Sequence, residues 1–374
     1  MSLYIDLSEF LTHPITTGIQ RITGEMCKYL PPSALTPVRV HRGTYVRLPS
    51  GLISAIGDHF RQGSHSGTAE IHRLGDPTSA RSVKIDSADT VLVPEVFDEP
   101  GRLTYFREQP DFNLEQYRFI VFDLLPLTHP EYFWADKLGI YEYFKLLRRA
   151  THCGFISEDT RQIYYGRLKR TDYRGGVVLP LGCDSLGPRP TQLRLNRGLN
   201  FTVIGTIEPR KNPELVLDAF EPLLREVKGL RLSFVGRMGW VSSAFAARVH
   251  ALAADENSGF RFFSAPGDDS LRSCIAESRA TIYVSVAEGY GLPPLESLWL
   301  GTPVIASKTI PSLNGLNSSA GIHFVDPLSI GNLRRAVLSF LNEEYANSKT
   351  QETLTLKLPT WRSFTDEVLH WCAS

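Results

Sequence analysis

The chain has 374 residues, of which 42% are hydrophobic and 21% are charged, so it has an ordinary globular composition and is long enough for two domains. Its 40 basic residues balance its 40 acidic residues, which gives no indication of a nucleic-acid partner. The five cysteines are scattered and lack C-x-x-C spacing, so we expect buried free thiols and neither a disulfide framework nor a zinc site.

The amino terminus, Met1-Ser-Leu-Tyr-Ile-Asp-Leu7, is typical of a first strand. It lacks the basic region and the long apolar core of a signal peptide. No apolar run approaches the ~20 residues that span a bilayer. We therefore expect a cytoplasmic protein that is at most peripheral to the inner face of the cytoplasmic membrane.

In the first half of the chain, short apolar runs alternate with amphipathic segments. This pattern predicts strands at residues 3–7, 90–97, 118–123, 153–157 and 177–181, and helices at 18–30, 132–149 and 158–168. Residues 45–85 show no clear pattern. The segments 143–149 and 164–174 mix basic and aromatic residues, which suits either a solvated helix face or contact with an anionic membrane or a lipid-linked acceptor.

The second half shows nearly strict alternation of strands and helices. The predicted strands are 201–207, 230–235, 260–263, 281–287, 303–306 and 321–325, and the predicted helices are 213–227, 242–254, 269–278, 292–300, 330–342 and 361–372. Residues 188–199 contain two prolines and show no helical or strand periodicity of apolar residues. They are therefore predicted to form a linker between a domain at 1–187 and a domain at 200–358.

Alternation of this kind predicts an α/β protein with two Rossmann-like, doubly wound parallel-sheet domains that face a cleft. The last segment, residues 359–374, is expected to form a helix that can cross back to the first domain. Ligands of open parallel sheets bind beyond the carboxyl ends of the strands, and the residues that follow are all at such ends.

Glu288-Gly-Tyr-Gly-Leu-Pro-Pro-Leu-Glu296 is the most informative stretch of the chain. A buried strand precedes it, and a glycine turn then opens a helix with prolines in its first turn. Strand, turn and helix in this order direct backbone amides and a positive helix end toward an anion. The two carboxylates suit sugar hydroxyls, so the stretch predicts a site for phosphate and sugar together.

Glu208-Pro-Arg-Lys-Asn212 follows the first strand of the second domain. Arg210 can bind a diphosphate through two parallel hydrogen bonds, and Lys211 can bind it as a compact positive charge. The alternative is that both side chains belong to an ordinary turn that faces solvent. In Val235-Gly-Arg-Met-Gly-Trp240, two glycines permit close approach of a ligand to the backbone. For Trp240 we favour packing over a role in the cleft wall.

The first domain offers weaker candidates. Gly18, in Thr16-Thr-Gly-Ile-Gln-Arg21, starts a helix whose amides could face a phosphate. Asp123 ends a strongly apolar strand and is either a cleft residue or a helix cap. Three histidines qualify by residue type only, and a structural role is more common for each: His13, His129 and His152.

With these residues assembled, the chain resembles the retaining glycosyltransferases of family 4, which share the two-domain GT-B fold. Residues 288–296 are similar to the E-x7-E motif of the family in its EGFGLP form, with Tyr290 in place of Phe. Residues 301–307 resemble the next element, and 178–184 the crossover into the second domain. Residues 203–212 resemble the donor-phosphate loop, in the T-x-E-P-R-K-N form of the O-antigen and mannosyltransferase-like branch.

The resemblance implies roles for these positions. Lys211 would bind the donor diphosphate, and Arg210 would replace the arginine that often stands where this chain has Thr206. Glu288 would contact hydroxyls of the transferred sugar, and Glu296 would hold the ribose. The implied donor-binding set is Gly18, Thr206, Arg210, Lys211, Gly236, Arg237, Ser264, Ala265, Pro266, Glu288, Gly289, Tyr290, Gly291, Leu292 and Glu296.

From the first domain, the resemblance implies that Asp123 lines the sugar pocket. Many members of the family place a histidine just before this position, where Phe122 stands here, so His129 is only a candidate substitute. The implied catalytic set is Asp123, Glu288, Arg210 and Lys211.

The implied activity is retaining transfer of a sugar from a nucleotide diphosphate sugar to a hydroxyl of a glycan or lipid-linked acceptor in polysaccharide or O-antigen (lipopolysaccharide) biosynthesis. GDP-mannose is the donor suggested by the branch. No Asp-x-Asp cluster is present in the sequence, so we expect no metal and no cofactor. The alternatives are a sugar-nucleotide epimerase on a GT-B-like scaffold, a glycogen-phosphorylase-like enzyme, and a non-catalytic protein that binds nucleotide sugars.

Overall fold

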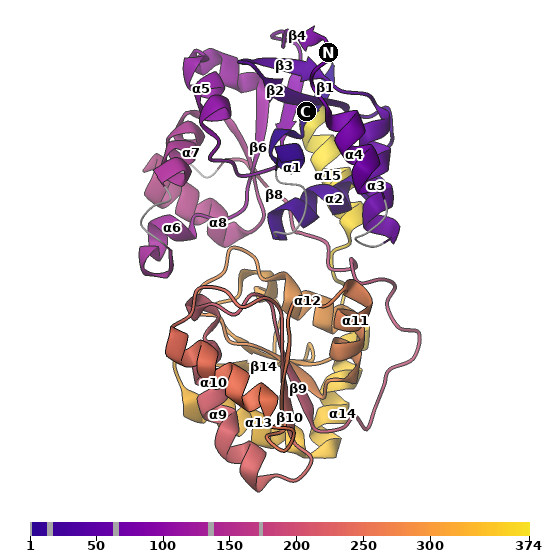
Figure 1. Ribbon diagram of the computed structural model, residues 1–374, viewed down its shortest axis with the longest axis vertical. Helices are drawn as coiled ribbons and strands as arrows, with labels where there is room; N and C mark the ends of the chain where they lie inside the picture. Colours follow the sequence, from indigo (N-terminus) through magenta and orange to yellow (C-terminus); the bar gives the residue numbers. More distant parts are fainter. Residues whose placement is uncertain (1, 13–17, 63–66, 134–137, 172–174) are drawn as a thin grey trace. The chain divides into compact units, whose positions relative to one another are not determined.

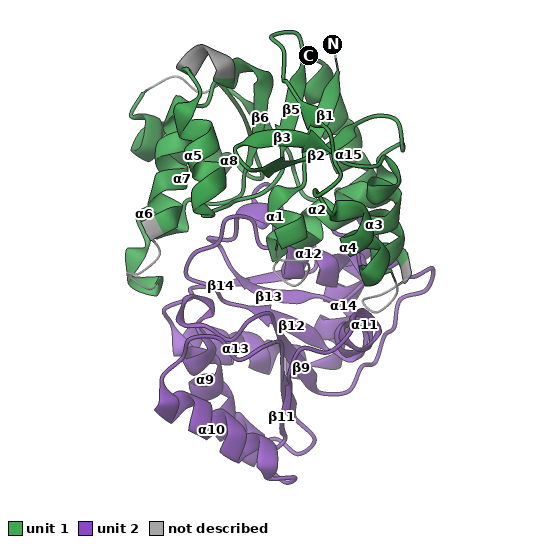
Figure 2. Cartoon of the chain, turned by 45° about the horizontal axis from the view of Figure 1, so that its top comes forward, with its two compact units in different colours: residues 1–182, 359–374 green, residues 183–358 purple. Residues whose placement is uncertain are grey.

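The protein forms two compact units, one of residues 1–182 and 359–374 and the other of residues 183–358 (Figure 2). The computed structural model describes residues 2–12, 18–62, 67–133, 138–171 and 175–374. Each unit is built around its own sheet.

The first unit contains an eight-stranded sheet in the order β4-β3-β2-β1-β5-β6-β7-β8 (Figure 1). The strands from β2 to β8 pair in parallel, and β3 and β4 add antiparallel pairs at one edge. The strands are β1 (Leu3–Asp6), β2 (Thr36–His41), β3 (Thr44–Arg47), β4 (Ser82–Val83), β5 (Thr90–Val93), β6 (Tyr117–Val121), β7 (His152–Phe155) and β8 (Val177–Val178).

Most helices of this unit lie between parallel strands. They are α1 (Ser8–Thr12), α2 (Gly18–Tyr29), α3 (Gly51–Gln62), α4 (Thr68–Gly75), α5 (Pro100–Glu108), α6 (Leu125–Thr128), α7 (Leu138–Arg149), α8 (Glu158–Ile163) and α15 (Trp361–Ala373). Shorter helical turns lie at η1 (Asp111–Gln116), η2 (Pro130–Tyr132) and η3 (Tyr164–Lys169). The region 45–85, which has no clear sequence pattern, supplies β3, α3, α4 and β4.

The C-terminal helix α15 belongs to the first unit, although residues 183–358 separate it from the rest of that unit in the sequence. It contacts α2 and β5, and Trp361 at its start is fully buried. Thr360 and Ser363 form a capping box that satisfies backbone groups at its amino end. The helix therefore crosses back to the first domain, as the sequence predicts.

A buried ion pair lies at the carboxyl end of β1. Asp6, the last residue of the strand, accepts a hydrogen bond from Arg102 Nη2 of α5 at 2.7 Å, and both side chains are at most 1% exposed. The hydroxyl of Tyr45 donates to the same carboxylate oxygen at 2.8 Å. These contacts satisfy a carboxylate that burial alone would destabilise.

Glu95 is a second fully buried carboxyl group and follows β5, the neighbour of β1. It accepts hydrogen bonds from the backbone N–H of Phe10 at 2.7 Å and from the hydroxyl of Thr23 at 3.2 Å, and so joins α1 to α2. Burial raises the pKa of Glu95 to about 8, although the charge of Arg102 acts in the opposite direction.

We expect Glu95 to make the fold less stable as the pH rises. Its pKa is raised in the folded protein from the ordinary 4.5 to about 8, so the folded chain holds a proton that the unfolded chain releases. The stabilising contribution is thus present below pH 4.5 and is lost as the pH rises through 8. The slope is at most about 1.4 kcal/mol per pH unit for one proton.

Urea unfolding of wild type and Glu95→Gln across this pH range measures the effect, because glutamine resembles the protonated carboxyl group but does not titrate. The difference in unfolding free energy between the two proteins should change with pH. The other titratable groups that interact with Glu95 are Glu9 and Cys27, and both remain in the variant, as do the hydrogen-bond donors Phe10 and Thr23. A pH-independent difference would contradict the prediction.

The second unit contains six parallel strands in the order β11-β10-β9-β12-β13-β14. Numbered within the unit, this is the order 3-2-1-4-5-6 of doubly wound nucleotide-binding sheets. The strands are β9 (Asn200–Ile204), β10 (Arg231–Val235), β11 (Phe260–Phe263), β12 (Ala280–Tyr283), β13 (Val304–Ser307) and β14 (Ile322–Val325). The chain reverses its direction across the sheet between β9 and β12, where such folds place their ligands.

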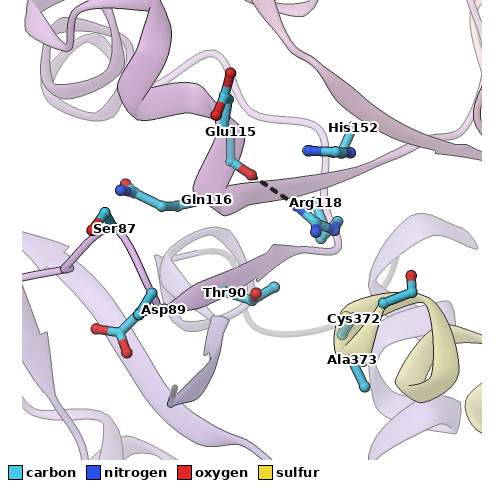
Figure 3. Close-up of a pocket in the computed structure, with 11 residues that line it drawn as sticks. Ser87, Asp89, Thr90, Glu115, Gln116, Arg118, His152, Cys372 and Ala373 are labelled. Carbon is cyan, nitrogen blue, oxygen red and sulfur yellow. Dashed lines mark hydrogen bonds between the residues drawn. The ribbon is translucent and has the colours of Figure 1, made fainter.

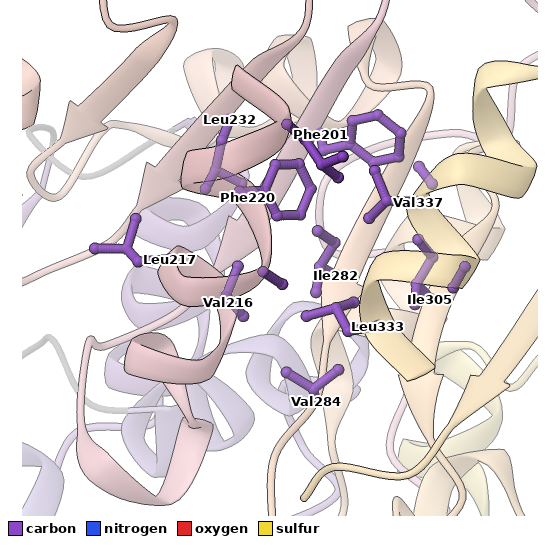
Figure 4. Packing of buried hydrophobic residues seen from close by; sticks show 14 of the residues in the cluster. Phe201, Val216, Leu217, Phe220, Leu232, Ile282, Val284, Ile305, Leu333 and Val337 are labelled. Atoms are coloured by element: carbon purple, nitrogen blue, oxygen red, sulfur yellow. The ribbon is translucent and has the colours of Figure 1, made fainter. Parts of the chain in front are cut away.

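The helices of this unit are α9 (Pro213–Glu226), α10 (Ser243–Ala254), α11 (Asp268–Glu277), α12 (Leu292–Trp299), α13 (Ile330–Leu341) and α14 (Glu343–Glu352). Side chains of α9 and α13 pack on the central strands in one apolar core (Figure 4). There the rings of Phe201 on β9 and Phe220 on α9 lie edge to face, with centroids 5.5 Å apart. This core fixes β9 and β12, the two strands that lead into the site described below. Within the described ranges, no helix has both the length and the apolar character needed to cross a membrane.

Candidate active site

Most predicted site residues of the second unit lie at the carboxyl ends of β9 and β12, which are paired neighbours in the sheet. β9 leads into the short turn η4 (Pro209–Lys211), and β12 leads into the loop that carries Glu288. The backbone N–H of Val286 donates to the carbonyl of Arg210 at 2.9 Å, which ties the two loops together. The sheet order thus brings together residues that lie almost 80 positions apart in the sequence.

Arg210 joins the two loops through its guanidinium group. It forms ion pairs with Glu208 and Glu288, and Nη1 donates to the carbonyl of Ala287 at 2.8 Å. Burial alone would lower the pKa of Arg210, but Glu288 and Glu208 raise it above the usual value. Arg210 is therefore a charged clamp between the loops in addition to being a candidate ligand for phosphate.

Lys211 is held less tightly. Its Nζ lies 3.6 Å from Glu288 Oε1, donates to the hydroxyl of Tyr283 at 3.2 Å and lies 5.0 Å from the centroid of the Tyr283 ring. Gly205, at the end of β9, has a φ of +115°, and a Cβ there would come within 2.9 Å of Lys211 Nζ. Glycine at this position leaves room for the ammonium group.

Glu288 is the centre of the cluster, with only 9% of its side chain exposed. Oε2 pairs with Arg210, and Oε1 accepts the hydroxyl hydrogen of Tyr283 at 2.8 Å. Burial would raise the pKa of Glu288, but Lys211 and Arg210 lower it to about 2, so the group is a carboxylate at neutral pH. Two cations and two carboxylates, the second being Glu208, leave the cluster with no net charge.

The turn before α12 has the geometry expected from its sequence. Gly291 has a φ of +91°, and a Cβ there would lie 2.5 Å from Ile310 Cγ2, so glycine is required. Ser312 fixes the turn, since its N–H donates to the carbonyl of Tyr290 at 2.8 Å and its hydroxyl to that of Gly291 at 2.6 Å. No side chain caps the amino end of α12 in the described structure. Pro293 and Pro294 have no backbone N–H, so of the first three residues of the helix only Leu292 can offer one, and this N–H and the positive helix end are suited to an anionic ligand.

Glu296 lies on α12 and is 6% exposed. Its Oε1 accepts a hydrogen bond from the hydroxyl of Ser185 at 2.7 Å. Ser185 follows the predicted crossover segment and was not among the predicted site residues.

The loop after β10 lies beside the loop after β9. Gly236 has a φ of +150°, and a Cβ there would come within 2.1 Å of the carbonyl oxygen of Gly205. The N–H of Ile207 donates to the carbonyl of Arg237 at 2.8 Å, and the N–H of Gly239 to that of Ile207 at 2.9 Å. The structure therefore brings Gly236 and Arg237 next to Thr206 and the Arg210–Lys211 turn.

At this edge of the sheet, one group of predicted residues lies farther from the cluster, and one aromatic residue is more exposed than expected. Ser264, Ala265 and Pro266 follow β11, which β10 separates from β9, so they lie farther along the same edge. Trp240, for which we favoured packing, is 36% exposed.

Asp123 and His129, two candidates of the first unit, lie at the two ends of α6, whereas Gly18 lies in α2. Asp123 follows β6, and its Oδ1 accepts the backbone N–H of Leu125, the first residue of α6, at 3.2 Å, which resembles the helix-cap alternative. His129 ends the same short helix and shares a hydrogen bond of 2.9 Å with the hydroxyl of Thr128. Gly18 is the first residue of α2, and a Cβ there would meet no atom within 4 Å. Thr16, Thr17 and His13 lie outside the described residues.

His152 begins β7 and thus lies at the opposite end of the sheet from Asp123. It lines a pocket of about 410 Å³ at the amino ends of β5, β6 and β7, together with Arg118 and the last residues of the chain (Figure 3). Arg118 donates to the carbonyl of Glu115 at 2.9 Å within this pocket. His152 is therefore not at the sheet edge where we expected the catalytic groups.

Several basic side chains of the segments 143–149 and 164–174 contact the protein itself. Lys145 pairs with Glu142 at 2.6 Å, Lys169 donates to the carbonyl of Ala150 at 2.8 Å, and Arg149 donates to the carbonyl of Phe106 at 3.3 Å. Residues 172–174 lie outside the described part of the chain. These contacts favour the solvated-face alternative for part of the basic residues.

The similarity to a known protein family lies within the second unit. Residues 192–355 match the family described as glycosyl transferases group 1. A serotype-specific mannosyltransferase WbdA of Escherichia coli is 35% identical over 328 residues, which cover 81% of this chain and 38% of that protein. The O-antigen chain mannosyltransferase B of Escherichia coli is 30% identical over 143 residues, 38% of this chain and 36% of that protein. The chain thus spans less than two fifths of the length of either relative.

Solved structures show the same fold at low sequence identity. HepE of Anabaena, in complex with UDP and glucose, has a TM-score of 0.65 at 11% identity, over 100% of both chains. Sucrose-phosphate synthase of Thermosynechococcus elongatus has a TM-score of 0.57 at 16% identity, over 83% of this chain and 77% of that one. These neighbours confirm the predicted GT-B fold class of two parallel-sheet α/β domains. The family match itself places the similarity to glycosyl transferases group 1 in residues 192–355.

Proposed function

We propose that the protein is a retaining glycosyltransferase that moves a sugar from a nucleotide diphosphate sugar to a hydroxyl of a glycan or lipid-linked acceptor in O-antigen or related polysaccharide biosynthesis. The observation that carries the proposal is the cluster of Lys211, Arg210 and Glu288 beside the uncapped amino end of α12. Cations and backbone N–H groups suit the diphosphate, and a buried carboxylate suits the sugar. The names of the Escherichia coli relatives support mannose as the sugar, so GDP-mannose is the first donor to test.

The chemistry requires stabilisation of negative charge on the departing diphosphate. Lys211 is suited to this role, because its contact with Glu288 is long at 3.6 Å and can be exchanged for a phosphate oxygen. The positive end of α12 adds a second source of stabilisation. Because these groups supply positive charge at the leaving group, our proposal includes neither a metal nor another cofactor.

The second requirement is stabilisation of positive charge at the anomeric carbon. Glu288 is ionised at neutral pH and can accept hydrogen bonds from the sugar, and a carboxylate near an oxocarbenium-like centre lowers the barrier. The proposal keeps Asp123 as a further carboxylate that acts on the sugar, as the family resemblance implies. With a lipid-linked acceptor, the reaction would take place at the inner face of the cytoplasmic membrane, and this location is part of the proposal.

A screen of nucleotides by thermal unfolding tests the proposal. We expect one nucleoside diphosphate among GDP, UDP, ADP and TDP to stabilise the protein by about 2.7 kcal/mol at roughly 100 times its dissociation constant. The preferred donor should then release that diphosphate only when an acceptor is present, with the anomeric configuration of the product equal to that of the donor. Stabilisation by no nucleotide would contradict the proposal, and turnover without any acceptor would favour an epimerase.

A further inference from the structure

We propose that Tyr283 is a positioning residue that holds Glu288 in place while the donor diphosphate occupies Lys211. The inference rests on the proposed function and assigns a role to a residue that is not part of the E-x7-E stretch or of the Arg210–Lys211 turn. It follows from the contacts of one hydroxyl group.

Tyr283 is the last residue of β12 and is 5% exposed. Its hydroxyl donates to Glu288 Oε1 at 2.8 Å and accepts from Lys211 Nζ at 3.2 Å. An ammonium group can only donate, and a carboxylate can only accept, so the direction of both hydrogen bonds is fixed. Burial and the charge of Glu288 raise the pKa of Tyr283 well above its usual value, so the hydroxyl keeps the proton that it donates.

The ring of Tyr283 has little freedom to move away from this position. A Cβ on Gly291, at the start of α12, would lie 3.6 Å from Tyr283 Cε1, so the ring lies directly against that turn. Lys211 Nζ lies 5.0 Å from the ring centroid on the β9 side. Because β12 is a central strand, paired with β9 and β13, its last residue is well fixed.

The hydrogen bond from Tyr283 matters most when Lys211 exchanges Glu288 for a phosphate oxygen of the donor. Arg210 pairs with Glu288 Oε2 and is itself held by Glu208 and by the carbonyl of Ala287, whereas Lys211 lies 3.6 Å from Oε1. A diphosphate would therefore recruit Lys211 more readily than Arg210. In the loaded site, Tyr283 would be the remaining partner on Oε1 among the residues that the structure describes, so each carboxylate oxygen would keep a protein hydrogen bond.

Removal of this hydroxyl should affect turnover more than donor binding. In Tyr283→Phe, we expect kcat to fall about 10- to 100-fold, the range for a hydrogen bond to a charged group. The dissociation constant for the nucleoside diphosphate, measured by titration calorimetry, should change less than about threefold, because Lys211 and α12 remain. An unchanged kcat, or an equal loss in nucleotide affinity, would overturn the inference.

Tyr345→Phe is the matched control. The hydroxyl of Tyr345 shares a hydrogen bond of 2.7 Å with His323 Nδ1 in the same unit, but it belongs to α14 and not to the site. This variant loses one hydrogen bond of a tyrosine hydroxyl, whereas Tyr283→Phe loses two, and we expect its kcat to equal that of the wild type. A similar loss of kcat in both variants would show that general loosening of the unit, and not positioning of Glu288, causes the effect.

A double-mutant cycle separates positioning from an independent role. If Tyr283 acts through Glu288, then Tyr283→Phe should reduce kcat little further in a Glu288→Ala background, which has no acceptor for the Tyr283 hydroxyl. Losses that multiply would overturn the inference. If wild type turns over no nucleotide sugar, the proposed function fails, and the same cycle is then read from thermal unfolding. There, non-additive losses in Tm support the contact of Tyr283 with Glu288, and additive losses refute it.

Discussion

Replacement of Lys211 by alanine is expected to lower kcat/KM for the donor by about 10²- to 10³-fold, the usual effect of removing one well-directed group that stabilises charge. Nucleotide affinity should fall together with turnover, because the ammonium group would contact the diphosphate both before and during transfer. The fold should tolerate the change, since Glu288 keeps Arg210 and Tyr283 as partners. Steady-state kinetics with the preferred donor and calorimetric titration of its diphosphate measure the two effects.

Lys228→Ala is the control for this experiment, because Lys228 is an exposed turn residue of the same unit. It removes the same charge from the unit without altering the cluster, so both kinetic constants should remain at the wild-type values. Equal kinetics for Lys211→Ala and wild type would remove Lys211 from the donor site. Equal losses in the two lysine variants would instead indicate that only the overall charge matters.

The second unit could be predicted well from the sequence because its strands are short buried runs, each followed by an amphipathic helix. For example, β12 and α12 both lie within the predicted ranges 281–287 and 292–300 or within one residue of them. The site residues follow directly, since any residue just after such a strand lies at the carboxyl edge. The strand order, with β9 next to β12, came from the structure, and it is what brings Lys211 to Glu288.

The strands and helices of the first unit are harder to predict, because its apolar residues follow a less regular pattern. β3 and β4 have only four and two residues and pair antiparallel at an edge, so neither gives a periodic signal. α5 has almost no amphipathic character and was not predicted, although its Arg102 forms the buried ion pair with Asp6. A polar side chain that is buried by a distant partner cannot be recognised from local sequence alone.

The same reason explains the site residues that were missed. Tyr283 looks like one more apolar residue of a buried strand, and only the structure shows its hydroxyl between Lys211 and Glu288. The sequence shows Glu208 as one charged residue of the phosphate loop, and only the structure shows that it pairs with Arg210. A polar group at the end of a buried strand, a few residues before a candidate carboxylate, is the signal that could have identified Tyr283.

Replacement of Glu288 by glutamine should separate turnover from donor binding. We expect kcat to fall about 10²- to 10³-fold, because a neutral amide no longer stabilises positive charge at the anomeric carbon. Affinity for the nucleoside diphosphate should stay the same or increase, since Arg210 and Lys211 lose a competing negative charge and the cluster changes from neutral to a net charge of +1. This is the opposite of the pattern expected for Lys211→Ala, in which both quantities fall.

The comparison with Glu214→Gln makes the test specific. Glu214 is exposed in the first turn of α9, close in sequence to the phosphate loop, and its replacement changes the charge of the unit by the same amount. We expect wild-type kcat and wild-type nucleotide affinity for this variant. If Glu288→Gln instead weakens nucleotide binding while kcat is retained, Glu288 acts on the nucleotide and not on the sugar. The sugar-contact role would then have to be assigned to another carboxylate, with Asp123 the first to test.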